Sequence, residues 1–392
     1  MPKNVCVIGA GVSGLTSAIR LAENNHTVTI VANEHGSETT SSVAAAFWYP
    51  FWVGDKPAHD WYDPVWAADT YRKLETLPRT PETGISKVTL KEFFESRMTD
   101  KEIQDVINGM WWREWKEDEW NLPGLNFQED LSQQEVSQRG VQGFQFKRGI
   151  SFSTFVVNMN DYLPFLKKSA EDLKVNFDKP QSVNDIIDLL TQYDSVVNCC
   201  GIGARALVDD DRRPSNAPGL LGPHRLEAIE GVVLRLAPLE EVRDILLVHT
   251  GAFYVPGKPY PGNYFGGQPL YIVPRGGSSP DIILGGSTTP EDELQEPERK
   301  NWKVQHLAWD NIPGDHWIRQ YTNRIYDDCC AFEKSLVRAN ILEAHVGYRP
   351  VPTPEVRLER DENIIHNYGH GGAGVTLSWG CAERVAQLIE QN

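Results

Sequence analysis

Residues 5–23 read VCVIGAGVSGLTSAIRLAE, an apolar run that leads into the pattern G-x-G-x-x-G at Gly9–Gly14. The apolar residues before the glycines predict a buried strand over Lys3–Ile8. Apolar residues at helical spacing predict a helix over Val12–Asn24, and a second strand is expected over His26–Val31. In such a βαβ unit the glycines permit a tight turn, close approach of a pyrophosphate and close packing of helix on strand. The helix N-terminus adds amide donors, so the stretch predicts a dinucleotide-binding fold.

An acidic residue that hydrogen-bonds a ribose hydroxyl usually follows this fingerprint by about 20 positions. Here the sequence has Asn33 and Glu34 at that place. Asn33 can accept one such bond, and Glu34 supplies the carboxylate if the second strand ends one residue later. We therefore expect both residues near the adenosine, although an asparagine departs from the usual pattern.

The composition limits the class of protein. A chain of 392 residues exceeds the size at which single cores usually stop growing, so we expect two domains. No stretch approaches the ~18 apolar residues of a membrane span, and a net charge of −16 argues against nucleic-acid binding. The first strand starts too early for a signal peptide, and the six cysteines read as small buried side chains rather than disulfides. We expect a cytoplasmic protein without membrane or nucleic-acid partners.

Hydrophobic periodicity places further elements along the chain. Helices are expected over Trp61–Leu77, Asp100–Trp111, Asp161–Lys174 and Gly374–Ile389, and a buried strand over Ser195–Cys200. Strands of an antiparallel sheet are expected over Gly231–Leu236, Ile245–His249, Leu270–Val273 and Ile282–Leu284. The predicted class is α/β, with a Rossmann-like domain and a second domain built on an antiparallel β-sheet.

A second glycine cluster, HNYGHGGAG at His366–Gly374, precedes the last predicted helix. A turn that opens a helix N-terminus suits an electron-rich group. His366 and His370 would need a helix to form a metal pair, and the glycines indicate a turn instead, so we expect no metal site. Upstream, Arg349 beside Pro350 offers a rigid guanidinium for a carboxylate, with a surface salt bridge as the alternative.

Several separated segments together resemble the D-amino-acid oxidase family, which also includes D-aspartate oxidase. In order along the chain these are Val7–Gly14, Thr39–Trp48 (TTSSVAAAFW), Tyr162–Leu166, Val196–Gly201, Gly347–Pro350, Val356–Arg360, His366–Gly372 and Trp379–Ala382. The resemblance implies noncovalent FAD and oxidative deamination of a D-amino acid, by hydride transfer from the α-carbon to flavin N5. The products would be the imino or 2-oxo acid, ammonia and hydrogen peroxide. It also implies an FAD-binding domain of residues 1–48, 155–207 and 343–392, and a substrate domain of residues 49–154 and 208–342.

The resemblance assigns roles to individual residues. Arg349 would bind the substrate carboxylate, Tyr271 would assist it, and the Gly372 carbonyl would accept a bond from the amine. The family's second tyrosine position is Gly267 here, which makes Tyr264 the substitute. The expected cofactor ligands are Gly9, Ala10, Gly11, Val12, Ser13, Gly14, Asn33, Glu34, Thr39, Thr40, Ser41, Ala45, Ala46, Phe47, Ser182, Cys200, Gly201, Gly371, Gly372, Ala373, Gly374, Val375 and Thr376.

The sequence leaves several alternatives open. A glycine or sarcosine type amine oxidase shares the expected fold, and a D-aspartate-specific oxidase would need a second cation, for which Arg148, Arg225 and Arg275 are candidates. An NAD-dependent dehydrogenase uses the same glycine fingerprint, and a non-catalytic flavin-binding protein would keep the fold without the reaction. The expected partners are a small amino acid and oxygen, and a homodimer remains open.

Overall fold

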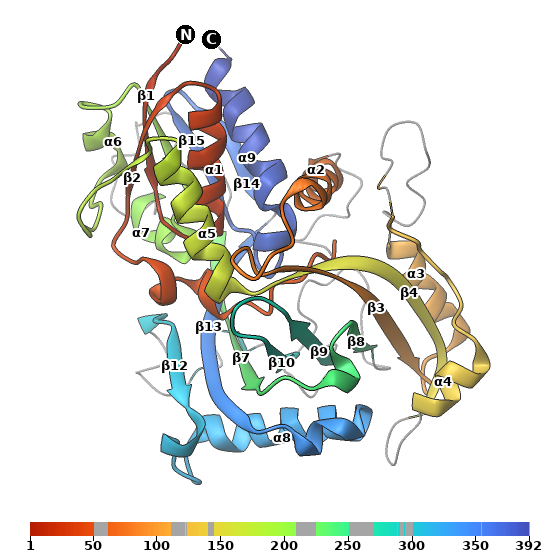
Figure 1. Cartoon of the computed structure of the whole chain (residues 1–392). Helices are drawn as coiled ribbons and strands as arrows, with labels where there is room; N and C mark the ends of the chain where they lie inside the picture. The colour runs from red at the N-terminus through yellow and green to blue at the C-terminus, as the bar shows by residue number, and fades with distance from the viewer. Residues whose placement is uncertain are drawn as a thin grey trace.

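The computed structural model describes residues 1–50, 62–110, 122, 124–139, 145–208, 225–250, 270–287, 289–290, 294, 301–353 and 355–391. Within these residues the chain forms two sheets with helices around them (Figure 1). One sheet follows the order β14-β15-β6-β1-β2-β5, and the other follows β12-β13-β7-β10-β9-β8-β3-β4 with β11 paired to β7. No helix in the described part of the chain combines the length and apolar character needed to cross a membrane.

The first sheet contains the predicted βαβ unit. Its strands are β1 (Asn4–Ile8), β2 (Thr27–Val31), β5 (Asn176–Phe177), β6 (Ser195–Asn198), β14 (Arg357–Asp361) and β15 (Ile364–Tyr368). All neighbours pair in parallel except β14 and β15. Because side chains alternate along a strand, Val5 and Val7 join the core shared with the large helices, whereas Cys6 and Ile8 join a smaller core on the other face.

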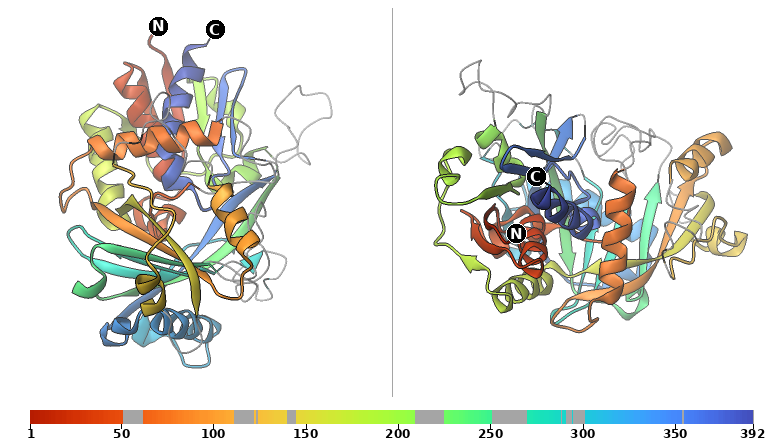
Figure 2. Two further views of the ribbon diagram at one scale, coloured as in Figure 1. Left: turned by 90° about the vertical axis from the view of Figure 1, so that its right-hand side faces the viewer. Right: turned by 90° about the horizontal axis from the view of Figure 1, so that it is seen from above.

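Helices cover both faces of this sheet. The larger core includes residues of α1 (Val12–Glu23), α5 (Met159–Asp172) and α9 (Gly374–Glu390). The smaller core receives α6 (Ile186–Leu189) and α7 (Ala204–Val208). Figure 2 shows α2 (Tyr62–Thr76) lying across α9, and the N- and C-termini emerge side by side.

The strand order creates a crevice at the carboxyl ends of β1 and β6. From β1 the sheet continues to β2 on one side and to β6 on the other, so the strand order changes direction at β1. Such a switch point is where α/β sheets bind ligands. Gly9 has φ +109°, and a Cβ there would lie 2.5 Å from the carbonyl oxygen of Cys199. A Cβ on Gly14 would lie 2.0 Å from the carbonyl oxygen of Gly9. The two glycines therefore allow turn, strand and helix to meet.

The second sheet is larger than the sequence predicted. Its strands are β3 (Ile85–Glu95), β4 (Phe146–Val157), β7 (Arg225–Leu236), β8 (Ile245–Thr250), β9 (Leu270–Arg275), β10 (Asp281–Gly285), β11 (Thr289–Pro290), β12 (Gln305–Ala308) and β13 (Ile341–Thr353). All its pairings are antiparallel except that of β3 with β8. The expected antiparallel sheet is therefore present with one parallel pairing, between β3 and β8, which are distant in sequence so that no hairpin sets their relative direction.

The two faces of this sheet have different neighbours. Helix α8 (Trp317–Phe332) packs on one face, and its Ile318, Ile325 and Phe332 share a core with residues of β7, β9 and β10 (Figure 1). The opposite face contributes Val88, Leu90, Val233 and other residues to the core of the first sheet. The two sheets thus share one apolar core. The face of the second sheet that lies opposite α8 meets the crevice of the first sheet.

The predicted helices and strands are present within about two residues of their expected ends, except that β7 begins at Arg225 and not at the expected Gly231. Four long elements were missed, namely β3, β4, β13 and α8 with the bounds given above. Arg349 and Pro350 were expected beside a turn, but both lie within β13. Proline is tolerated there because β12 pairs with β13 only as far as Val346, so that among the described residues Pro350 has a paired strand, β7, on one side only. All six cysteines are free, as expected.

Candidate active site

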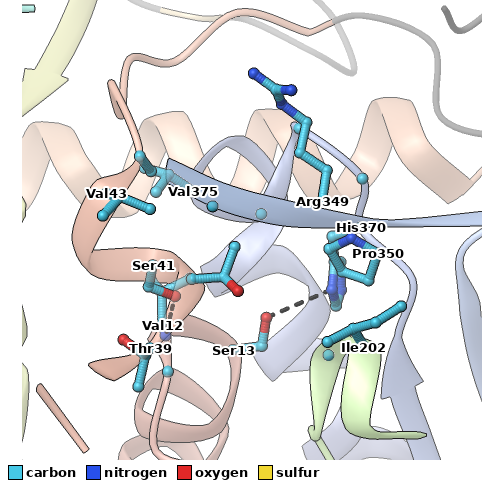
Figure 3. Close-up of a pocket in the computed structure, with 18 of the residues that line it drawn as sticks. Val12, Ser13, Thr39, Ser41, Val43, Ile202, Arg349, Pro350, His370 and Val375 are labelled. Atoms are coloured by element: carbon cyan, nitrogen blue, oxygen red, sulfur yellow. Dashed lines mark hydrogen bonds between the residues drawn. The ribbon is translucent and has the colours of Figure 1, made fainter. Parts of the chain in front are cut away.

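A cavity of about 880 Å³ begins at the carboxyl ends of β1 and β6 and continues over the second sheet. This volume lies in the upper part of the range typical of small-molecule sites. Segments far apart in the sequence line it, including the first glycine turn, residues 39–50, residues 199–207, and parts of β7, β9 and β13. Figure 3 shows Val12 and Ser13 of the glycine turn close to Ser41, Ile202 and His370, with Arg349 above them.

The crevice end of the cavity has the features of a dinucleotide site. Gly11 caps α1 without any side-chain cap, so the helix N-terminus faces the cavity with backbone amides. The amide of Val12 donates to Ser41 Oγ at 3.0 Å, which ties residues 39–43 to the glycine turn (Figure 3). Asn33 and Glu34 line the same cavity beyond β2. These residues fit the pyrophosphate and ribose of FAD.

Most of the expected cofactor ligands line this cavity. They are Gly9, Ala10, Gly11, Val12, Ser13, Asn33, Glu34, Thr39, Thr40, Ser41, Ala45, Ala46, Phe47, Ser182, Cys200, Gly201, Gly371, Gly372, Gly374 and Val375. Gly14, Ala373 and Thr376 lie behind the wall instead. Gly14 packs on the first turn, and the Thr376 hydroxyl accepts the Tyr49 amide at 3.2 Å, so both shape the wall rather than face the cavity.

The second glycine cluster forms the predicted turn before α9. Gly369 and Gly371 have φ of +81° and +52°, and the Gly371 amide donates to the Pro350 carbonyl at 2.9 Å. His370 is buried, with Nε2 3.0 Å from Asn367 Oδ1 and Nδ1 3.5 Å from Ser13 Oγ (Figure 3). His370 therefore connects the two glycine turns. Burial lowers the pKa of His370 to about 4, so the ring is neutral near pH 7.

The buried His370 makes stability depend on pH. Its pKa is about 4 when folded and about 6.5 in an unfolded chain, so between these values the unfolded state binds more protons. The free energy of unfolding therefore has its full value with respect to His370 above pH 6.5. It falls by up to about 3 kcal/mol as the pH is lowered towards 4. We expect Tm to fall more steeply over this interval in the wild type than in His370→Gln. Parallel curves in a thermal melt series would contradict the assignment.

Arg349 reaches across the second sheet from β13. Its Nη1 donates to the Ser287 carbonyl at 3.0 Å, and its positive charge acts on the nearby Tyr271 side chain. Figure 3 shows the Arg349 side chain pointing away from His370. A Cβ on Gly231 would lie 2.4 Å from Arg349 Nη1, so the guanidinium passes directly over this glycine. Both Arg349 and Gly231 line the cavity.

Tyr271 lies beside Arg349 on β9. A Cβ on Gly285 would lie 2.4 Å from the Tyr271 ring, so the ring leans over Gly285 toward Arg349. Burial raises the pKa of Tyr271, and the positive charge of Arg349 partly opposes this rise. The hydroxyl is therefore protonated near pH 7. Arg349 and Tyr271 together form a donor pair that suits a carboxylate.

Gly231→Ala tests this arrangement, because the added methyl group displaces the guanidinium. We expect kcat/KM to fall about 10- to 100-fold, since a misplacement of about 1 Å at a positioning group has that effect. Flavin content should stay at the wild-type level, because Gly231 lies away from the glycine turns. Steady-state kinetics measures kcat/KM, and the absorbance of bound flavin measures the flavin content. Unchanged kinetics would mean that the guanidinium position is not critical.

Sequence reasoning missed three charged residues of the cavity, namely Glu92, Asp105 and Arg205. Glu92 lies on β3, is 2% exposed and lines the cavity, and Tyr49 Oη donates to its Oε2 at 2.8 Å. Asp105, Val106 and Met110 line the same region. The local signal in the sequence, KVTLKEFF at residues 87–94, is that Glu92 follows Val88 and Leu90 at every second position, on the face of the strand that they share.

Other expected residues do not reach the cavity. Arg148 bonds Glu129, Asp130 and Gln104, whereas Arg275 is buried with Asp281. Neither lines the cavity, so the idea that they supply a second substrate cation was wrong. Tyr264 and the side chain of Arg225 lie outside the described residues.

Among the residues that the structure describes, one group has the composition of a metal site. The ligand atoms of His306, Glu343 and His345 lie within 4.8 Å of one another. Glu343 accepts from Arg235 Nη1 at 3.1 Å and lies 2.8 Å from His345 Nε2. We assign the group to the ion network of the sheet, because Arg235 already balances the carboxylate. His366 and His370, the pair considered from the sequence, are not part of it.

Comparison with known sequences identifies relatives over the whole chain. The model of a family described as FAD dependent oxidoreductase, DAO, matches residues 4–388. A D-amino-acid oxidase of Rubrobacter xylanophilus is 32% identical over 387 residues, covering 97% of this chain and 94% of the relative. A D-aspartate oxidase of Homo sapiens is 26% identical, covering 99% of this chain and 94% of the relative.

Solved structures share the fold at lower sequence identity. Glycine oxidase from Geobacillus kaustophilus has a TM-score of 0.68 and 17% identity, covering 99% of this chain and 95% of that one. An L-alpha-glycerophosphate oxidase from Mycoplasma pneumoniae with FAD bound has a TM-score of 0.69 and 14% identity, covering 100% and 96%. These likenesses establish the fold.

Proposed function

Because this chain belongs to the FAD-dependent oxidoreductase (DAO) family, we propose that it deaminates free D-amino acids by oxidation at the α-carbon. The observation that carries the proposal is the Arg349–Tyr271 pair in the cavity that the glycine turns open. Membership in a family of FAD-dependent oxidoreductases argues against an NAD-dependent dehydrogenase. It also argues against a non-catalytic flavin-binding protein.

The substrate is held by groups of this chain. Arg349 and Tyr271 bind the substrate carboxylate as hydrogen-bond donors, which fixes one end of the amino acid. The Gly372 carbonyl accepts a bond from the amine, and Gly372 lines the cavity beside the second glycine turn. With two ends fixed, the α-hydrogen of one enantiomer faces the cofactor, so catalysis is chiefly orientation.

FAD binds noncovalently in this proposal. The α1 N-terminus and residues 39–47 hold the pyrophosphate and the ring system, and Asn33 with Glu34 holds the ribose. Cys381 lies buried in α9 and does not line the cavity, which agrees with a noncovalent cofactor. Bound FAD would supply the acceptor for the hydride of the α-carbon, with oxygen as the final acceptor of the two electrons and hydrogen peroxide as its product. The imino acid hydrolyses to the 2-oxo acid and ammonia.

The remaining expectations belong to the same proposal. The partners are the amino acid and oxygen, the location is the cytoplasm, and a homodimer is the assembly to test. The free thiols of the described cysteines agree with a reducing compartment. We also propose the domain bounds expected from the sequence, with residues 1–48, 155–207 and 343–392 in the FAD-binding domain and residues 49–154 and 208–342 in the substrate domain.

A flavin-reduction assay tests the proposed function. The protein is purified with FAD, made anaerobic, and mixed with D- and L-amino acids, glycine and sarcosine. We expect bleaching of the flavin absorbance with at least one D-amino acid and none with its L-enantiomer. Under air the same substrate should yield hydrogen peroxide and a 2-oxo acid in equal amounts. Bleaching by sarcosine or glycine alone would replace the proposal by a secondary-amine or glycine oxidase.

A further inference from the structure

One buried hydrogen-bond donor in the wall of the cavity has no acceptor in the described part of the protein. It is the indole Nε1 of Trp302, which lies in the segment before β12 and lines the cavity together with Asn301. The Nε1 atom is shielded from solvent, and no atom of the residues that the structure describes accepts a hydrogen bond from it. Because buried polar groups are normally hydrogen-bonded, this donor indicates that a ligand supplies the acceptor.

The neighbours of Trp302 place it at the crevice of the first sheet. Arg205 of α7, just after β6, lines the cavity, and its Cζ lies 4.7 Å from the centroid of the Trp302 ring. The next residue, Lys303, is close to Glu34, which follows β2. Burial raises the pKa of Glu34, and the positive charge of Lys303 opposes part of this rise. Since β6 and β2 flank β1, Trp302 lies where the pyrophosphate and ribose of a dinucleotide bind.

The backbone around Trp302 is held in an uncommon conformation. Trp302 has φ +53°, which bulky side chains rarely adopt. Asn301 Oδ1 accepts the Lys303 amide at 3.0 Å, and the Trp302 ring packs against the core of the second sheet. Such conformations persist only where the surroundings fix them, and they cluster at ligand sites. The indole is therefore positioned by the second sheet before any ligand binds.

We propose that Trp302 binds the ADP half of FAD by donating a hydrogen bond from Nε1 to one of its oxygens, beside the guanidinium of Arg205. All cofactor ligands expected from the sequence belong to the proposed FAD-binding domain, whereas Trp302 belongs to the proposed substrate domain. Bound FAD would thus connect the two domains through Trp302. The inference rests on FAD as the cofactor and does not depend on which substrate is oxidised.

Trp302→Phe isolates this hydrogen bond, because it keeps an aromatic ring and removes the N–H donor. The full-length protein is stripped of FAD and titrated with FAD, and quenching of the flavin fluorescence gives Kd. We expect Kd to rise about 10-fold, since the cofactor loses a buried hydrogen bond. ADP added as a competitor should bind more weakly by the same factor. A loss of affinity for FAD without a loss for ADP would place the contact on the flavin half and overturn the inference.

Trp309→Phe is the matched control. Trp309 also stacks with an arginine, with Arg319 Cζ 3.7 Å from its ring centroid, but it does not line the cavity. We expect the wild-type Kd for FAD in this variant.

Thermal melts separate cofactor binding from packing. A ligand raises Tm according to its Kd, so the increase in Tm on adding FAD should be smaller in Trp302→Phe than in the wild type. A wild-type Kd in Trp302→Phe, or an equal loss in Trp309→Phe, would show that the inference is wrong. A lower Tm with an unchanged increase on adding FAD would assign Trp302 to packing alone. If the wild-type protein takes up no FAD, the cofactor itself is wrong, and the role of Trp302 fails with it.

Discussion

Replacing Arg349 with methionine is expected to lower kcat/KM between about 100-fold and a few thousand-fold. Methionine keeps much of the side-chain length and removes the charge and the donors. Removing one partner of a buried, hydrogen-bonded charge pair costs about 3 to 5 kcal/mol, and each 1.4 kcal/mol is a tenfold change. The loss should appear mainly in KM, because the substrate carboxylate loses its partner in the ground state as well. Steady-state kinetics with the best D-amino acid measures it.

Two further variants sharpen this test. Arg349→Lys keeps the charge but not the bidentate geometry, so its kcat/KM should lie between those of the wild type and Arg349→Met. Arg243→Met changes an exposed arginine that pairs with Glu240, and should keep wild-type kinetics. The flavin spectrum of each variant should match the wild type. An Arg349→Met protein with full turnover would remove Arg349 from the substrate site.

Gly14→Ala is expected to abolish FAD retention. Its Cβ would lie 2.0 Å from the Gly9 carbonyl oxygen and 2.8 Å from the carbonyl carbon. Both atoms belong to the backbone of the first turn, so α1 or the turn must move. Overpacking of this kind costs about 3 kcal/mol or more when backbone has to shift. The measurements are the ratio of flavin to protein absorbance after purification and Tm.

Gly314→Ala is the matched control for this substitution. It makes the same chemical change at a glycine where a Cβ would meet nothing within 4 Å. We expect wild-type flavin content and a stability change within about 0.5 kcal/mol. If Gly14→Ala retained stoichiometric flavin and the wild-type Tm, close packing of helix on strand would not be the role of this glycine.

Local patterns were sufficient for the two glycine turns and for the helices that follow them. The strand, turn and helix around Gly9–Gly14 form as predicted, and so does the turn before α9. In both places a short contiguous segment determines the geometry, because glycine conformation, helix periodicity and capping act over a few residues. The resemblance of separated segments then identified the family that the whole-chain comparison supports.

The second sheet was predicted only in part. The long strands β3 and β4 run beside each other, and each alternates between apolar and polar residues over a short stretch only, at residues 87–91 and 150–153. An alternation this short is a weak signal for a strand of 11 or 12 residues. Strand β13 was hidden by Pro350, which usually indicates a turn or a strand edge. Only the tertiary structure shows that the pairing of β13 with β12 ends at Val346, before Pro350 is reached.

The sequence alone determined the glycine turns and the helices that follow them, because short-range sterics and periodicity encode them. The tertiary structure decided which distant strands pair. That pairing places Arg349 over Gly231 and Tyr271 over Gly285. It also places Glu92 in register with Tyr271 through Val248. These contacts depend on strand register between segments far apart in the chain, and register follows from burial of a whole face rather than from any local pattern.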